Sequence, residues 1–158
     1  MKVKSARAFS LVELLIVITI LSILGTIAVP NFAKYRGNAN LKEAAREISG
    51  DIKLCKQRAV AENIEYRILL SVANNTYTIQ KETSPSNWEN VYPTKKICED
   101  DAHIKIIGNP TFAGDKIIFY TRGTTSAGTM EIQHEKMLSK ISIVTSLMGR
   151  VKIKFDLK

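Results

Sequence analysis

One acidic side chain stands inside an otherwise apolar stretch. Glu13 is the single charged residue in "FSLVELLIVITILSILGTIAV", residues 9–29. A carboxylate among lipid tails costs roughly 2.5–3.5 kcal/mol. The cations Lys2, Lys4 and Arg7 all precede this stretch, so the stretch itself supplies no positive partner. The chemistry expected of Glu13 is therefore electrostatic pairing with a cation.

A second charge pattern lies near the C-terminus. Residues 140–158 have a net charge of +4, from the five cations Lys140, Arg150, Lys152, Lys154 and Lys158 against Asp156. Arg150, Lys152 and Lys154 occupy alternate positions, so in a strand they share one face. Such a basic stripe can bind phosphate groups, with an affinity that falls as salt rises. An ordinary solvated face, or a face against another protein, is the alternative.

Two cysteines and two histidines are the other candidates for site chemistry. A disulfide between Cys55 and Cys98 would close a loop of about 43 residues and restrict the unfolded chain by about 4 kcal/mol. Two free, buried thiols are the alternative. The spacing of the two cysteines and of His103 and His134 matches no pattern of metal ligands, so no metal site is predicted. Each histidine is expected as a surface or partly buried strand residue.

Catalytic and ligand-binding motifs are missing from the sequence. The acidic run "CEDD" (98–101) lacks the spaced oxygen ligands of a calcium loop, so it is interpreted as a solvated loop. The chain has no glycine-rich phosphate loop and no nucleophile elbow. A membrane-anchored enzyme would need a clustered acid–base set. The sequence therefore predicts no enzyme, no cofactor and no small-molecule substrate.

The element that carries Glu13 is a candidate membrane span. The chain has 158 residues and a net charge of +8, which suits one domain plus this segment. A helix over residues 9–29 would span roughly 30 Å, the thickness of a bilayer core. Its cations all precede it, so residues 1–8 are expected in the cytoplasm and the rest outside. No small-x-small cleavage site follows Val29, so the segment is expected to stay; a plain signal anchor is the alternative.

The helical pattern continues to residue 62 and changes character at Pro30. A proline inside a helix is expected to kink it, and helical pattern on both sides favours a kink over an end. Beyond it the apolar residues recur at spacings of three and four, as in an amphipathic helix. These residues are Phe32, Tyr35, Leu41, Ala44, Ala45, Ile48, Ile52, Cys55 and Ala59.

After residue 63 the pattern becomes that of strands. Strands are predicted at 64–71, 76–82, 103–107, 116–121, 129–134, 140–145 and 150–157, and residues 83–102 are interpreted as a long loop. The predicted fold class is α+β, with a long kinked N-terminal helix packed by its second half on one antiparallel sheet of six or seven strands. The predicted parts are 1–8, 9–30, 31–62 and 63–158.

The quoted motifs resemble a known family. "AFSLVELLIVITILSILGTIAVP" resembles the class III signal of type IV pilins and type II secretion pseudopilins, in which a basic leader precedes Phe and an apolar helix with Glu as fifth mature residue. "KIIFYTRGTTSAGTMEI" and "ISIVTSLMGRVKI" resemble the GspH/FimT-type minor pseudopilins. The resemblance implies a pilin-like fold.

The resemblance also implies roles for named residues. A prepilin peptidase would cut between Ala8 and Phe9, and the new Phe9 amine would be N-methylated. Ala8 departs from the family's glycine. Glu13 could then pair with the amine of Phe9, in its own chain or in a neighbour, and so set register. Two opposite charges at ~4 Å attract by about 4 kcal/mol at an effective dielectric near 20.

The implied function is structural. The resemblance suggests a minor pilin or pseudopilin in the tip or priming complex of a type IV pilus or a type II secretion pseudopilus. Its partners would be other pilins, the prepilin peptidase and the bacterial inner membrane, with the C-terminal domain outside the cytoplasm. The alternative is a DNA-binding minor pilin for DNA uptake. For that role Gly149, Arg150 and Lys152 fit the Gly-Arg-x-Arg stretch of FimT-type members, and Lys154 shares their strand.

Overall fold

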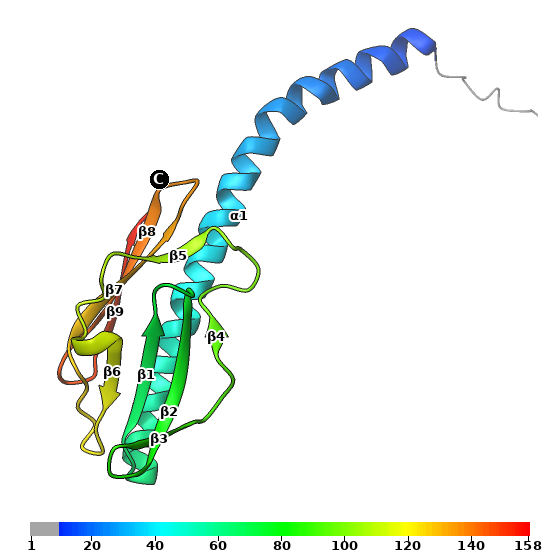
Figure 1. The fold of residues 1–158 in the computed structure, drawn as a ribbon. Helices are drawn as coiled ribbons and strands as arrows, with labels where there is room; N and C mark the ends of the chain where they lie inside the picture. Colours follow the sequence, from blue (N-terminus) through cyan, green and yellow to red (C-terminus); the bar gives the residue numbers. More distant parts are fainter. Residues whose placement is uncertain (1–9) are drawn as a thin grey trace, which may run out of the picture. The chain divides into compact units, whose positions relative to one another are not determined.

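The computed structural model describes residues 10–158 and divides the chain into two compact units. Helix α1 (Leu11–Glu62) contributes to both, because the first unit ends at Arg36 and the second spans residues 37–158. Figure 1 shows α1 followed by the strands of the second unit in chain order.

In the first unit α1 is helical throughout, and its large apolar side chains are exposed. The helix continues through Pro30 without ending, as predicted; a kink at Pro30 stays a prediction. The hydroxyls of Thr19 and Ser22 donate to carbonyls one turn earlier, which satisfies them within the helix. Phe32 and Tyr35 were expected on a buried face, but they are 67% and 72% exposed. That expectation was wrong because, among residues 10–36, the structure describes no second element for the helix to pack against.

In the second unit the same helix buries one face. The buried positions recur at three and four residues, as the amphipathic pattern predicted from Leu41 onwards. Many of the side chains are small, which allows strands to approach the helix axis closely. The buried residues are Gly37, Leu41, Ala44, Ala45, Ile48, Ser49, Ile52, Cys55 and Ala59.

The strands form two antiparallel sheets, and the prediction of one sheet was wrong. The first sheet has the order β3-β2-β1-β6, with β4 also paired to β2; its strands are β1 (Tyr66–Ser71), β2 (Thr76–Ser84), β3 (Asn87–Asn90), β4 (Lys95–Lys96) and β6 (Lys116–Phe119). The second has the order β5-β7-β8-β9, with β5 (Ile104–Ile107), β7 (Gly128–His134), β8 (Ser139–Thr145) and β9 (Val151–Asp156). A short 3-10 helix, η1 (Ala113–Asp115), precedes β6. The predicted α+β class is confirmed.

The segment 83–102 was interpreted as a loop, and this was wrong in part. It contains the end of β2, all of β3 and all of β4. Trp88 pairs with Glu82 across β2 and β3, and the Arg67 guanidinium lies 4.2 Å from the Trp88 ring centre. These short strands are polar and lie at a sheet edge, so they lack the apolar alternation by which strands are predicted.

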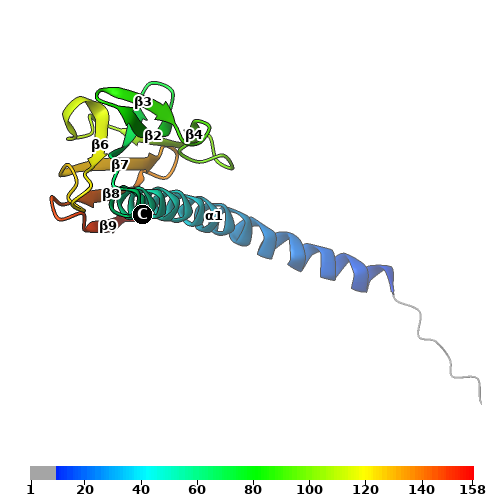
Figure 2. The same cartoon turned by 90° about the horizontal axis from the view of Figure 1, so that it is seen from below.

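Both sheets and α1 share one hydrophobic core. Alternate residues of β1, β2, β7 and β8 are buried, which gives each sheet one inward face. Tyr66, Tyr77 and Phe119 are the largest fully buried side chains. Figure 2 shows the strands gathered to one side of α1 within this unit. The outward faces of the sheets are therefore available to carry charge.

Candidate functional site

Glu13 lies in the first turn of α1 and is exposed. A carboxylate there is favoured by the partial positive charge of the helix N-terminus. No described residue forms an ion pair with it. Ala8 and Phe9, the predicted cleavage and methylation positions, lie outside the described residues, so the pairing of Glu13 with Phe9 stays a prediction.

The first unit presents a continuous apolar surface around Glu13. An 18-residue window of α1 has a mean hydropathy of 2.6, and none of that window is buried. Leu21 and Ile27, for example, are 60% and 62% exposed. By length and composition this part of α1 can cross a membrane. Its side chains are free to contact lipid or apolar surfaces of other proteins.

Cys55 and Cys98 are both free in the structure, which therefore does not contain the predicted disulfide. Cys98 lines a surface recess together with Ala44 and Glu47 of α1. Cys55 lies eight residues beyond Glu47, which is about 12 Å along a helix. Disulfides join Cα atoms about 4.4–6.8 Å apart. Burial, and then the charge of Asp51, raise the pKa of the Cys55 thiol to about 12, so Cys55 is an unreactive core residue.

His134 and Asp101 form a contact that the sequence did not predict. His134 is buried, with Nε2 3.1 Å from Asp101 Oδ2, and the backbone N–H of His103 donates to Asp101 Oδ1 at 3.0 Å. Burial tends to raise the pKa of Asp101, but these hydrogen bonds and the nearby His134 hold it below its usual value.

The acidic run is therefore not simply a solvated loop. Asp101 attaches it to the end of β7, and His134 is more buried than expected because it faces the interior. His103 is half-buried, as predicted. In residues 10–158, no group of three or more His, Cys, Asp or Glu side chains is placed to hold a metal ion.

The basic stripe lies on an exposed edge strand. Lys152 and Lys154 are exposed on β9, and Arg150 precedes that strand. On the same face Lys154 lies opposite Ser142 of β8, which lies opposite Glu131 of β7. Ser142 donates to the Glu131 carboxylate at 3.0 Å.

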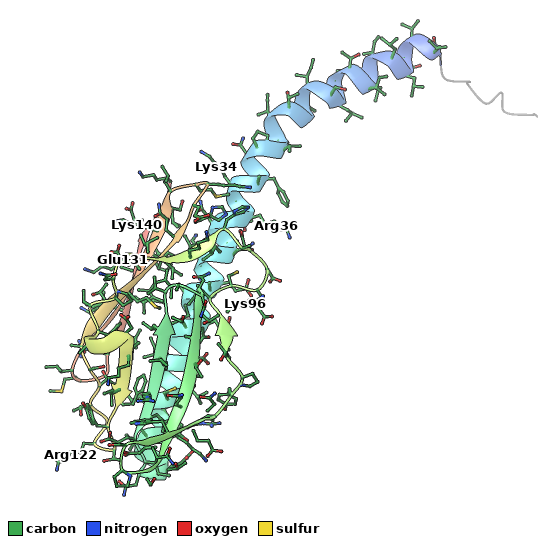
Figure 3. The ribbon with its side chains drawn as sticks, in the orientation of Figure 1. Lys34, Arg36, Lys96, Arg122, Glu131 and Lys140 are labelled. Carbon is green, nitrogen blue, oxygen red and sulfur yellow. The ribbon has the colours of Figure 1, made fainter. Side chains whose placement is uncertain are left out.

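An acid therefore stands within the same face as the lysines. Glu131 and Lys140, both labelled in Figure 3, lie on this face, because Glu131 pairs with Ser142 and Lys140 with Gln133. Asp156 also lies opposite Lys140 across β8 and β9. Lys152 and Lys154 of β9 lie opposite Val144 and Ser142, so neither lysine has an acid opposite it.

Gly149 has a structural role in the turn between β8 and β9. Its φ is +69°, a conformation that side chains rarely adopt, and a Cβ there would lie 2.6 Å from the Lys56 Nζ. Lys56 of α1 donates to the Met148 carbonyl at 2.9 Å. The geometry explains this glycine without a ligand. Leu147 and Met148, which sequence reasoning did not select, are exposed in the same turn; the signal was two large apolar residues directly before a turn glycine.

Comparisons with known proteins give one family motif and several similar folds. The family described as "Prokaryotic N-terminal methylation motif" matches residues 3–29. The search of curated proteins returns no relative. The fold resembles the minor pseudopilin EpsH of the Vibrio cholerae type II secretion system, with a TM-score of 0.61 and 12% identity over 73% of this chain and 97% of that one.

A type IV minor pilin has a similar fold. FimU of Pseudomonas aeruginosa gives a TM-score of 0.60 and 17% identity over 76% of this chain and 92% of that chain. At such identities the likeness shows the fold alone. The chain therefore has a pilin-like fold and carries the N-terminal methylation motif.

Proposed function

We propose that this protein is a minor pilin or pseudopilin, a structural subunit of a type IV pilus or a type II secretion pseudopilus. The observation that carries the proposal is the first part of α1, which bears the methylation motif and buries none of its apolar window. A surface of this kind needs partners outside the chain, since leaving it in water is unfavourable by roughly 25 cal/mol per Å².

The partners change during the life of the subunit. Before assembly the apolar helix lies in the inner membrane, with residues 1–8 as the cytoplasmic leader and the sheet unit outside. Prepilin peptidase cuts between Ala8 and Phe9, and the Phe9 amine is methylated. In the filament the same helix packs against the helices of other pilins.

Glu13 sets the register in this packing. Four residues separate it from Phe9, one helical turn, so its carboxylate can reach the amine of its own chain or of the neighbouring chain. Either pairing offsets part of the cost of burying two charges. For the pairing between chains, a helix shifted by one turn would leave both charges unpaired in an apolar core, so that pairing selects one arrangement. The pairing within one chain would survive the shift and would set no register.

The test compares Glu13→Ala with Glu43→Ala in the full chain. Glu43 is an exposed acid on the same helix, in the second unit. We expect both variants to be inserted and cleaved, with Phe9 as first residue by mass spectrometry. Glu13→Ala should enter sheared filaments poorly beside wild-type subunits, and Glu43→Ala normally. Equal incorporation of the two variants would contradict the register role, and an uncleaved wild-type chain would contradict the proposed function.

A second candidate function is DNA binding by the same subunit. The observation that favours it is the exposure of Arg150, Lys152 and Lys154 along the free edge of the second sheet. Cations in this arrangement can contact successive phosphates, and binding should weaken steeply with salt. An electrophoretic shift assay on the detergent-solubilised chain tests it.

Two double variants, each lacking two cations, show whether the shift depends on the basic strand. Arg150→Ala with Lys152→Ala should abolish the shift, while Lys96→Ala with Lys136→Ala removes two other exposed lysines and should leave it. The absence of any shift at low salt, or equal losses in the two double variants, would count against this second function.

A further inference from the structure

The turn between β8 and β9 presents two large apolar side chains to solvent. Leu147 is 66% exposed and Met148 is 78% exposed, the latter equal to the most exposed residue of the apolar helix. We propose that Leu147 and Met148 are the anchor through which this subunit docks a neighbouring subunit of the filament, at an apolar recess bordered by carboxylates. This inference rests on the proposed function, and it names the surface and the chemistry of the partner.

The turn is held rigidly, which suits an anchor. The Gly149 N–H donates to the Ser146 carbonyl at 2.8 Å, and the Arg150 N–H donates to the Ser146 hydroxyl at 3.2 Å. Lys56 Nζ donates to the Met148 carbonyl from the helix side. A side chain presented on a fixed backbone loses less conformational entropy on binding than one on a mobile loop.

A neighbouring segment fixes the turn from another direction. The Thr125 N–H donates to the Leu147 carbonyl at 3.0 Å, and the Thr125 hydroxyl donates to the Ser146 carbonyl at 2.9 Å. Thr125 itself is buried. Because the backbone polar groups are satisfied inside the subunit, the exposed side of the turn is left with its apolar side chains.

The surroundings of the turn are cationic. Three chain segments meet there, 56–60 of α1, 120–125 and 146–150. A Cβ added at Gly123 would lie 3.4 Å from Val60 Cγ2 and 3.7 Å from Lys56 Cε. These segments contain Lys56, Arg58, Arg122 and Arg150. These cations outnumber the nearby acids, which are Glu62 close to Arg58 and Glu65 in one recess with Arg122. Arg58 lies over the Tyr92 ring, whereas Arg122 and Arg150 are exposed. Figure 3 shows Arg122 at the edge of the second unit.

This combination selects the chemistry of the partner. Two exposed apolar side chains bind best in an apolar recess from which water is excluded. The exposed arginines at the margin then favour carboxylates on the rim of that recess. Nucleic acid would use the arginines and leave Leu147 and Met148 in water.

A lipid surface fits less well than a protein. The turn has no Trp or Tyr, which are the side chains enriched at membrane interfaces. It packs on α1 at Lys56, nineteen residues beyond Gly37, which corresponds to about 28 Å along the helix. Gly37 is where the second unit begins after the membrane-compatible part of α1. The turn is therefore at the other end of this unit's helix.

A matched pair of crosslinking positions tests the proposal. Leu138 lies in the turn between β7 and β8, at the opposite end of β8, and is 57% exposed. In the full chain, in cells that assemble the filament, a photo-crosslinking amino acid replaces Met148 in one variant and Leu138 in another. We expect an adduct at position 148 about tenfold stronger than at 138, as for an anchor against a peripheral site.

The identity of the adduct decides between partners. The expected adduct is a second protein with its own N-terminal methylation motif, joined through a peptide that contains Asp or Glu. Arg122→Glu together with Arg150→Glu should reduce this adduct severalfold. Adducts with lipid or nucleic acid, equal yields at 148 and 138, or no adduct at 148 while the chain enters filaments would each overturn the proposal.

A substitution arm separates this proposal from the proposed function. Leu147→Ser with Met148→Ser should enter filaments less than wild type, whereas Leu138→Ser should enter normally; both should melt as wild type does, since all three side chains are exposed. Normal entry of the Leu147 and Met148 double variant overturns the docking site and leaves the proposed function standing. Absence of the wild-type chain itself from filaments overturns the proposed function.

Discussion

The two parts of α1 on either side of Gly37 differ in what covers their apolar side chains. Before Gly37 the helix is mostly apolar, with charges at Glu13, Lys34 and Arg36, and its large apolar side chains are exposed, as with Leu21 at 60%. After Gly37 it has fewer large apolar residues, yet Leu41 and Ile48 are buried at 0% and 1% exposure. The chain supplies a sheet layer for the second part only.

The two parts of the helix differ in which groups contact their apolar side chains. The buried part is stabilised by contacts within the chain, so its substitutions act on folding. The exposed part buries none of its apolar window, so we expect its substitutions to act on contacts with lipid or with other proteins rather than on folding. The same helix thus has an exposed apolar part and a buried part along its length.

The largest difference between the two parts is expected when a leucine in each is replaced by aspartate. Leu41→Asp places an unpaired charge in the core and should cost more than about 4 kcal/mol, enough to abolish folding of the second unit. Leu21→Asp should leave that unit's melting unchanged and reduce membrane association. Near-ultraviolet circular dichroism of the detergent-solubilised chain and membrane fractionation measure the two effects. Similar loss of folding in both variants would show that the two parts are not independent.

Shortening an isoleucine side chain to alanine should give a smaller difference between the two parts than the aspartate substitutions do. Ile48→Ala should lower the free energy of unfolding of the second unit by about 2–5 kcal/mol, because it leaves a cavity between α1 and the sheets. Ile20→Ala removes a side chain that is 52% exposed and should change that free energy by less than about 0.5 kcal/mol. Thermal unfolding of the full chain in detergent checks both. A shift from Ile20→Ala as large as that from Ile48→Ala would contradict the comparison.

The two parts of the helix also differ in the hydrogen bonds that their residues make with other elements. In the second unit Tyr77 donates to Asp51 at 2.7 Å, and Lys95 donates to the same carboxylate oxygen at 2.8 Å. Burial and this bond raise the pKa of Tyr77, so its hydroxyl stays protonated. Tyr77→Phe should cost about 1–2 kcal/mol, since a partly buried charge loses a donor.

The matched change in the first part is Thr19→Val. The Thr19 hydroxyl donates to the Leu15 carbonyl of the same helix, a local bond that holds no other element. We expect no change in the melting of the second unit. Chemical denaturation followed by tyrosine fluorescence compares the two variants, and equal midpoints would mean that the Tyr77 bond contributes nothing net.

The smallest expected effect is a dependence on pH. Because the pKa of Asp101 is lowered in the folded chain, its contribution is present above the ordinary value and is lost as pH falls through the folded pKa. The melting temperature should therefore drop as the pH falls below the ordinary aspartate pKa of about 3.9. Asp101→Asn should remove part of this drop, whereas Asp100→Asn, at an exposed position, should not. Identical pH profiles for the two variants would exclude a role for the Asp101 contact.

The sequence determined the features that repeat locally. The apolar helix, its amphipathic continuation from Leu41 and the strands that became β1, β2, β5, β6, β7, β8 and β9 follow from periods of 3.6 and 2. The N-terminal motif could also be identified from the sequence, because its residues lie within one short segment. Such patterns need no knowledge of what lies beside the element.

The tertiary structure decided everything that depends on which segments meet. It divided the strands into two sheets, paired the polar β3 and β4, kept Cys55 apart from Cys98, and brought Asp101 to His134. It also placed Lys56 under the turn that exposes Leu147 and Met148. These contacts join residues far apart in the chain, and side-chain periodicity gives the face of each element but not its neighbour. Only the packing of α1 against both sheets selects among the possible neighbours.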